Sequence, residues 1–158
     1  MFAPADYDLR PLTSNDESLL WEMLYEALSQ PGAAAPAREI VRRPEYARFV
    51  EGWGRSTDCG YVAHDKNEGT LLGAVWLRTP VEIQPGDDPA ELAFAVKEGH
   101  RQHGIGASLL TQMVRANPKL SSVLLHVGPG SPAVRLFERF GFEISSKEVH
   151  SVVLRRAI

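Results

Sequence analysis

The sequence predicts a mixed α/β fold in which helices flank one central sheet. Helical and strand-like hydrophobic patterns alternate along nearly the whole chain. A strand–helix–strand unit between residues 91 and 127 predicts two parallel strands, and hairpin-like patterns on both sides of it predict antiparallel ones. We therefore expect a mixed sheet of about six to seven strands with about four helices. With 158 residues, 44% of them apolar, residues 1–158 are expected to form one domain.

The first third of the chain predicts one strand and two helices. Residues 7–12 have a strand-like pattern, and Ser14 with Glu17 three residues later has the spacing of a capping box. A helix is expected to follow, with apolar residues at helical intervals: Leu19, Leu20, Met23, Leu24, Ala27 and Leu28. Residues 31–37 hold two prolines and a glycine and predict a loop before a second helix over residues 38–52.

The middle of the chain predicts a hairpin and then the strand–helix–strand unit. Residues 60–65 and 70–78 are β-rich and flank the turn-like "KNEG". "PGDDPA", 85–90, breaks the chain before a strand at 91–96 and a helix that ends at Asn117-Pro118. The apolar stripe of this helix consists of Ile105, Leu109, Leu110, Met113 and Val114.

The last third predicts a strand, a helix and a closing hairpin. Residues 121–127 form the parallel partner of 91–96. Ser131 has the character of an N-cap, Pro132 fits the first helical position, and Gly141 fits the C-cap. "FEI", 142–144, and "EVHSVVL", 148–154, then predict the final hairpin.

Charge and cysteine content exclude several classes of protein. Twenty acidic residues stand against 17 basic ones, a net charge of −3, with no basic block, so we expect no nucleic-acid partner. The N-terminus lacks the pattern of a secretory signal and no apolar stretch is long enough to span a bilayer, so a cytoplasmic protein without a membrane partner is expected. Cys59 is the only cysteine, which excludes an internal disulfide.

The segment "VKEGHRQHGIGASLL", 96–110, predicts an anion site. The first N–H groups of a helix have no partner within the helix, and its dipole places partial positive charge there. The amides of residues 104–107, with Arg101 beside them, would suit a pyrophosphate. The alternative is that Gly104 and Gly106 only ease a turn and a close contact between helix and sheet. The segment does not match a Rossmann fingerprint, because Leu109 stands where the third glycine is needed. It does not match a P-loop either, because it has no Gly-Lys-Ser/Thr.

Two stretches carry a resemblance to a known family. "RQHGIG" after "AELAFAV" resembles the R/Q-x-x-G-x-G/A acyl-CoA motif of the GNAT superfamily of N-acyltransferases, and "SPAVRLFERFGFE" is similar to that superfamily's late helix ending in G-F. The order of elements agrees from about residue 7 to residue 154. The resemblance implies the GNAT fold, with acetyl-CoA between the parallel strands 91–96 and 121–127, which would splay apart.

The resemblance also implies which residues bind the cosubstrate. The backbone of Ala95 and Val96 would bond the pantetheine, with the Val96 N–H near the thioester carbonyl, and the pyrophosphate would lie on the segment 101–106. The implied cofactor-binding set is Ala95, Val96, Arg101, Gln102, His103, Gly104, Ile105, Gly106, Ala107, Ser131 and Phe137.

Amine attack on a thioester needs a neutral amine. For a lysine-like pKa near 10.4, the neutral form at pH 7 costs about 4.6 kcal/mol, so a base is useful. Glu91 opens the strand that would carry the thioester, and the resemblance often places a carboxylate there, so Glu91 is the first candidate for the general base. The alternative is an exposed carboxylate at the start of a strand. His126 is the second candidate; the alternative is a packed or solvated histidine.

The chain departs from the family pattern at Phe137. Many relatives have a tyrosine there that protonates the departing thiolate, and phenylalanine has no proton to donate. The leaving thiol has a pKa near 8.5, only about 1.5 units above pH 7, so water could supply this proton. The departure leaves the general acid unassigned.

For the acceptor pocket and for metals the sequence offers weaker signals. Candidate pocket residues are Trp21, Tyr25 and Trp76, together with Arg38 and Trp53; the alternative is that the aromatic ones belong to the core. His100 and His103 have a ligand-like spacing but no matched further ligands, so we expect solvated side chains and no metal.

The expected function is therefore an acetyl-CoA-dependent N-acetyltransferase that moves an acetyl group to a primary amine of a small molecule or peptide, by direct transfer in a ternary complex. One alternative is a catalytically silent CoA-binding sensor or interaction module of the same fold, which the missing tyrosine permits. Another is a binding protein for a different phosphate ligand. A homodimer is possible, with no interface residue assigned.

Overall fold

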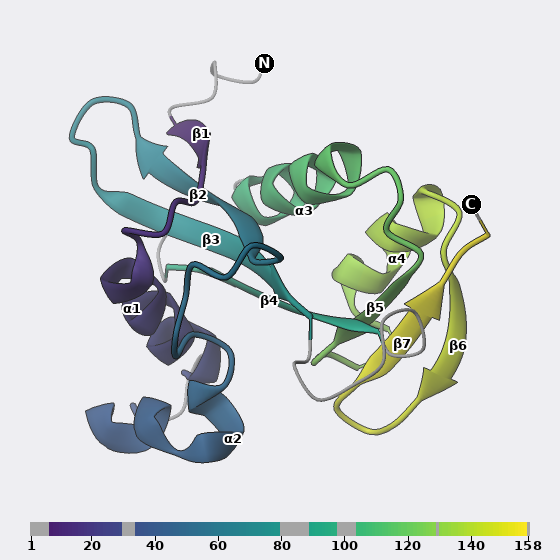
Figure 1. Cartoon of the computed structure of the whole chain (residues 1–158), viewed down its shortest axis with the longest axis horizontal. Coiled ribbons are helices and arrows are strands. Elements are labelled where there is room, and N and C mark those ends of the chain that lie inside the picture. Colours follow the sequence, from purple (N-terminus) through teal and green to yellow (C-terminus); the bar gives the residue numbers. More distant parts are fainter. Residues whose placement is uncertain (1–6, 30–33, 80–88, 98–103, 129, 158) are drawn as a thin grey trace.

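The computed structural model describes residues 7–29, 34–79, 89–97, 104–128 and 130–157. Its helices and strands alternate along the chain as the sequence predicts (Figure 1). In chain order they are β1 (Tyr7–Pro11), α1 (Glu17–Leu28), the 3₁₀ helix η1 (Arg38–Arg42), α2 (Pro44–Ala47), β2 (Cys59–Asp65), β3 (Leu71–Arg78), β4 (Ala90–Val96), α3 (Ile105–Ala116), β5 (Ser122–Leu125), α4 (Pro132–Arg139), β6 (Glu143–Lys147) and β7 (Val152–Arg155).

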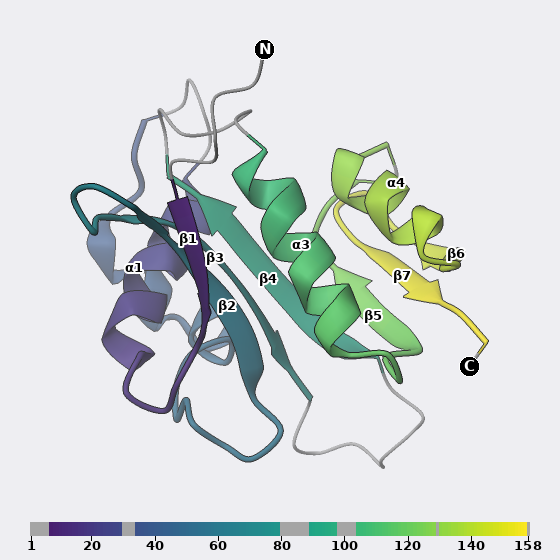
Figure 2. The same cartoon turned by 90° about the horizontal axis from the view of Figure 1, so that it is seen from above.

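The strands form one seven-stranded sheet in the order β1-β2-β3-β4-β5-β7-β6. Neighbouring strands pair antiparallel except β4 and β5, which are parallel, as the strand–helix–strand unit predicts. The parallel register covers Ala90–Leu92 opposite Val123–Leu125. Beyond that point β4 continues to Val96 along β3 alone, and β4 and β5 diverge (Figures 1 and 2). The sheet thus opens at the C-terminal ends of its two parallel strands.

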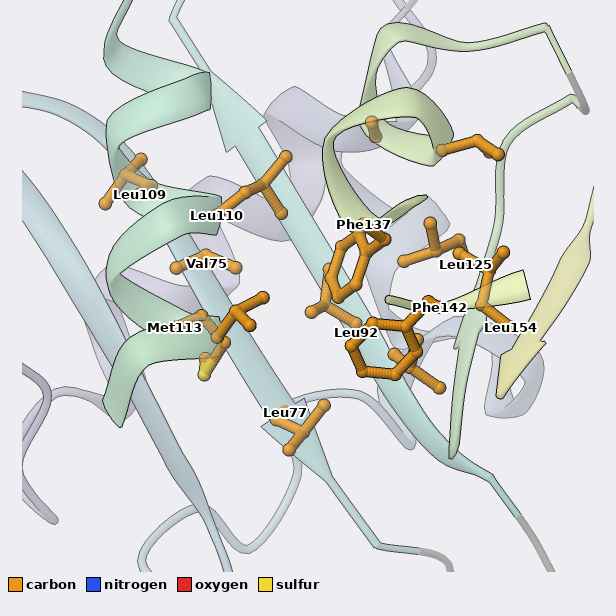
Figure 3. Packing of buried hydrophobic residues seen from close by; sticks show 14 of the residues in the cluster. Val75, Leu77, Leu92, Leu109, Leu110, Met113, Leu125, Phe137, Phe142 and Leu154 are labelled. Carbon is orange, nitrogen blue, oxygen red and sulfur yellow. The ribbon is translucent and has the colours of Figure 1, made fainter. Parts of the chain in front are cut away.

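Helices cover both faces of the sheet, and each face has its own hydrophobic core. Helices α3 and α4 lie on one face, with α1, η1 and α2 on the other (Figures 1 and 2). The α3/α4 core joins both halves of the sheet, since it contains buried residues from β3, β4, β5, β7 and both helices (Figure 3): Val75, Leu92, Leu110, Leu125, Phe137, Phe142 and Leu154 among them. The α1 core includes Leu20, Met23, Val50, Val62 and Trp76.

The first helix forms as predicted, but Ser14 does not cap it. Helix α1 begins at Glu17 with Asp16 as N-cap residue. The Asp16 carboxylate accepts hydrogen bonds from the Thr13 N–H at 2.7 Å and from the Arg10 guanidinium at 2.9 and 3.0 Å. A local turn and a bond to β1 therefore fix the start of the helix, in place of a capping box.

The predicted second helix over residues 38–52 is wrong in extent. The segment forms η1 and the four-residue α2, separated at Arg43, whose ψ is 137°. The cause is Pro44, which disfavours helical backbone at the preceding residue but fits the first position of a new helix.

The two outer strands differ in character. β1 ends at Pro11, which has no backbone N–H. β6 is exposed along its whole length, and its pairing with β7 shifts register between Ile144 and Ser146. The predicted strand at 142–144 is displaced, because Phe142 is buried in the core and β6 starts one residue later. Within the described ranges, none of the helices has the length and apolar character needed to cross a bilayer.

Candidate active site

Alternation along β4 sorts its side chains between the two faces of the sheet. Ala90 and Leu92 belong to the α3/α4 core, whereas Ala93 and Ala95 pack in the α1 core. Because strand side chains alternate, Glu91 shares the face of Ala93 and Ala95. Glu91 therefore lies on the α1/α2 side, at the last part of β4 that still pairs with β5.

Two side chains from distant segments converge on the Glu91 carboxylate. Oε1 accepts a hydrogen bond from Nη1 of Arg48, which follows α2. Oε2 lies 3.4 Å from Nε2 of His126, the residue directly after β5. The structure thus brings together the two predicted catalytic candidates and adds a cation that the sequence analysis did not single out.

The pKa of Glu91 is lowered by this environment. Burial is the largest single influence and raises the pKa. The hydrogen bonds from His126 and Arg48, with the positive charge of Arg48, outweigh burial and bring the pKa below its ordinary value. Glu91 is therefore a carboxylate at neutral pH.

His126 also has an aromatic neighbour. Its ring meets Phe49 edge-on, with centroids 5.3 Å apart and an interplanar angle of 87°. The Arg48 guanidinium lies 4.7 Å from the centroid of the same Phe49 ring. Phe49 therefore contacts both partners of Glu91 and sets their spacing.

Arg78 and Trp76 of β3 hold the segment that carries Arg48 and Phe49. Arg78 donates to the carbonyls of Arg48 at 3.1 Å and Glu51 at 2.7 Å, and it forms two 3.1 Å bonds with the Asp58 carboxylate. The Trp76 indole N–H donates to the Phe49 carbonyl at 2.9 Å. Sequence analysis missed Arg78; the available signal was an arginine at the end of the apolar run "LLGAVWLR".

The glycine step has two different physical origins. Gly104 has φ +81°, a left-handed conformation that favours glycine, so the turn itself accounts for it. Among the residues that the structure describes, a Cβ built on Gly106 would meet Val96 Cγ2 alone, at 3.7 Å, an ordinary contact. Close packing of the helix on the sheet therefore does not require glycine at position 106. Close approach of a ligand to the α3 N-terminus remains the alternative explanation for this glycine.

The other predicted cofactor residues fall in different surroundings. Arg101, Gln102 and His103 lie outside the described residues. Ala107 is exposed, whereas the Ile105 side chain is buried in the core.

Along β4, the Lys97 N–H donates to Leu72 of β3. Because the direction of backbone N–H groups alternates along a strand, the Val96 N–H lies on the opposite side of β4 from β3, and that of Ala95 on the β3 side. Of these two residues, Val96 is the one whose N–H lies on the side where β5 diverges.

Two predicted cofactor residues at the late helix have structural partners. Ser131 caps α4, its hydroxyl accepting the Ala133 N–H at 3.2 Å, as the sequence predicts. Phe137 is fully buried and packs edge-on against Phe142, with ring centroids 5.3 Å apart (Figure 3). A contact between Phe137 and a cosubstrate stays a prediction; in this structure its ring fills the core.

The predicted pocket aromatics do not form one cluster. Trp76 is fully buried, and Trp53 is buried with its indole N–H on the Thr13 carbonyl. Tyr25 and Arg38 line a shallow pocket of about 300 Å³ with Glu22, Glu26 and Lys97. Trp21 is half-buried beneath the guanidinium of Arg42, 4.4 Å from its centroid. Of the predicted set, Tyr25, Arg38 and Trp21 are at least partly exposed, and their contact with an acceptor stays a prediction.

Among the residues that the structure describes, no group of three histidine, cysteine or acidic side chains is arranged to hold a metal ion. His100 and His103 are outside that part of the chain.

Comparison with known proteins agrees with this architecture. Residues 21–142 match the profile of the acetyltransferase (GNAT) family. Mycothiol acetyltransferase of Brachybacterium faecium is 30% identical over 118 residues, which are 70% of this chain and 33% of that protein. The chain thus spans about a third of the length of this curated relative.

Solved structures share the fold at low sequence identity. A GCN5-related N-acetyltransferase from Kribbella flavida superposes with a TM-score of 0.66 at 22% identity, covering 99% of this chain and 100% of that one. The ribosomal-protein-S18-alanine N-acetyltransferase from Escherichia coli gives 0.61 at 14% identity, over 95% and 92% of the two chains. The fold matches in full length, and the family profile covers most of the sequence. The chain belongs to the GNAT family of acetyltransferases.

Proposed function

We propose that the chain is an acetyl-CoA-dependent N-acetyltransferase that acetylates a primary amine of a small molecule or peptide by direct transfer in a ternary complex. The observation that carries the proposal is the carboxylate of Glu91, bonded by Arg48 and His126 where β4 and β5 diverge. Bound acetyl-CoA would supply the thioester, and the acyl C–S bond breaks as the C–N bond forms.

Each group of the site has a role suited to its place. Glu91 accepts a proton from the amine, directly or through one water, because a carboxylate can take the proton only while ionised, which the lowered pKa ensures. His126 is exposed next to it and can carry that proton on toward solvent. The departing thiolate takes its proton from water, since Phe137 has no hydroxyl.

The α3 N-terminus supports binding of the cosubstrate's phosphates. Its first amides follow Gly104, which is exposed and has open space where a side chain would stand. Helix N-termini attract anions through unpaired N–H groups and the helix dipole. The Val96 N–H lies on the side where β4 and β5 diverge and remains the predicted pantetheine partner, whereas the N–H of Ala95 lies on the β3 side.

The first experiment measures thiol release from acetyl-CoA with a panel of primary amines. Release that depends on the amine supports the transferase. Tight acetyl-CoA binding without release for any amine would favour the silent sensor, the alternative that buried Phe137 keeps open.

The decisive variant is Glu91→Gln. General-base help contributes about 10²- to 10⁴-fold in rate, so kcat should fall by roughly that factor with little change in acetyl-CoA affinity. The loss should shrink as pH rises from about 6 to 9.5, because more of an amine with a pKa near 10.4 is then already neutral. Parallel pH profiles of kcat/KM, or a loss under about threefold, would remove Glu91 from the mechanism.

A further inference from the structure

Both oxygens of the Glu91 carboxylate are occupied in the free protein. Arg48 bonds Oε1 and His126 lies near Oε2. The Glu91 side chain is 12% exposed and that of Arg48 is 48% exposed. The two partners of Glu91 are exposed to a similar extent, Arg48 to 48% and His126 to 42%. Because the guanidinium is the partner with a permanent positive charge, a cationic acceptor group would compete for the place that it holds.

The Arg48 side chain can leave without disturbing the backbone that carries it. The Arg48 carbonyl accepts a hydrogen bond from Arg78, and the neighbouring Phe49 carbonyl accepts one from the Trp76 indole. Within the described part of the chain the Arg48 side chain has two contacts besides Glu91: Nε donates to the Glu45 carbonyl at 3.1 Å, and the guanidinium lies over the Phe49 ring. Ion pairs with an exposed member are weak, so displacement of this side chain has a low cost.

We infer that Arg48 holds the place of the acceptor's ammonium group at Glu91, and that it thereby selects acceptors that enter the site as cations. This inference rests on the proposed function. A half-buried carboxylate left without a positive partner is unfavourable, but exchange of one cation for another keeps its charge compensated. A neutral acceptor offers no such exchange and meets a site already closed by Arg48.

Displacement of Arg48 also helps Glu91 to take up the proton. While Arg48 is bound, its positive charge helps to keep the carboxyl pKa low, which weakens a base. An ammonium in the same place lowers the pKa in the same way, but its charge is lost when its proton moves to Glu91, and the raising effect of burial is then less opposed. The other charged groups facing Glu91 do not change: His126 stays beside it, and Arg78, its register partner on β3, remains matched by Asp58.

The test compares a cation with its neutral isostere. n-Butylamine, an ammonium at pH 7, and n-butanol are titrated into the protein while chemical shifts are followed by NMR. Arg48→Met keeps the aliphatic stem on Phe49 but removes the charge. It should bind n-butylamine about three- to tenfold more tightly than the wild type, because no internal cation competes, and n-butanol unchanged.

Three controls complete the design. Arg43→Met removes a charge from an exposed arginine that forms no ion pair with any described residue, and it should leave both affinities unchanged. Arg48→Lys keeps a cation and should resemble the wild type. In a Glu91→Gln background, Arg48→Met should no longer increase n-butylamine affinity.

Weaker n-butylamine binding in Arg48→Met, an equal gain for n-butanol, or a gain that persists in the Glu91→Gln background would each overturn the inference. These titrations do not need turnover. If thiol is released but the variants do not show the expected n-butylamine affinities, the inference alone is refuted. If the affinities are as expected but no thiol is released, the transferase is refuted and Arg48 remains a displaceable cation.

Discussion

Two carboxylate–arginine pairs, Asp58–Arg78 and Glu91–Arg48, are linked by the hydrogen bond from Arg78 to the Arg48 carbonyl. They differ in how far their side chains are buried. In the Asp58–Arg78 pair both side chains are buried, 1% and 6% exposed. In the Glu91–Arg48 pair the carboxylate is 12% exposed and the arginine 48%. Asp58 also accepts the N–H groups of Gly54 and Arg55.

The comparison separates a fixed pair from an exchangeable one. Arg78 uses its donors on Asp58 and on two backbone carbonyls, so every bond that it makes fastens one part of the chain to another. Arg48 shares its partner with His126 and faces solvent. The same two residue types therefore fix the segment 48–51 on β3 in one case, which we call the platform, and form part of the proposed reactive centre in the other.

The largest expected effect is on the platform. Arg78→Met removes the buried partner of Asp58 and leaves that carboxylate with two backbone N–H groups and with Arg55, whose Nε lies 3.4 Å from Oδ1. Breaking a buried pair costs about 3–5 kcal/mol of unfolding free energy, and these remaining partners place the expected cost at the lower end of that range. Arg48→Met, at the exposed pair, should cost less than about 1 kcal/mol. Urea denaturation of both variants measures the two values. Equal losses would show that the pairs do not differ in kind.

A second effect, smaller than the first, is the response of the platform to acid. The pKa of Asp58 is lowered: burial raises it, but bonds from Arg78 and from the Arg55 and Gly54 N–H groups outweigh burial. A carboxyl of this kind stabilises the fold above its unfolded pKa of about 3.9 and loses that contribution as pH falls through its lower folded pKa. The difference in unfolding free energy between wild type and Arg78→Met should therefore become smaller as pH falls below about 4. Thermal unfolding across pH 3 to 7 measures this gap; a gap independent of pH would assign the loss to packing alone.

The smallest effect concerns the second anchor. Trp76→Phe removes the donor to the Phe49 carbonyl and leaves a small void, at a cost of about 1–2 kcal/mol. Because Phe49 spaces Arg48 and His126, the variant should also lower turnover while acetyl-CoA affinity stays unchanged. Calorimetric titration beside the thiol assay separates these readouts, and a loss of acetyl-CoA affinity would contradict the anchor role.

Local signals made much of the fold predictable. The N-cap of α4 at Ser131 and the end of α3 before Asn117 follow from residues next to one another in sequence. The C-cap residue of α4 is Phe140, one residue before the predicted Gly141, which has φ +92°. The capping box at Ser14 fails because Arg10 of β1 binds Asp16, and the second helix fails because Pro44 restricts Arg43.

The site divides in the same way. Glu91 and His126 could be named from their positions in the two parallel strands, and they lie 3.4 Å apart. Arg48 is 43 residues from Glu91 in sequence, and Arg78 reaches back 30 residues to the Arg48 carbonyl. Sequence periodicity and spacing cannot predict contacts between such distant segments, because these contacts depend on how α2 packs on the folded sheet.

The two outer strands bear on how the protein behaves when it is crowded. An edge strand offers unpaired backbone groups to any other chain, which is a route to aggregation. Here β1 ends in a proline that cannot donate to a neighbouring strand, and β6 combines a register shift with charged Glu143 and Lys147 at its ends. Both ends of the sheet therefore resist the addition of a further strand, which favours a protein that stays dispersed at high concentration.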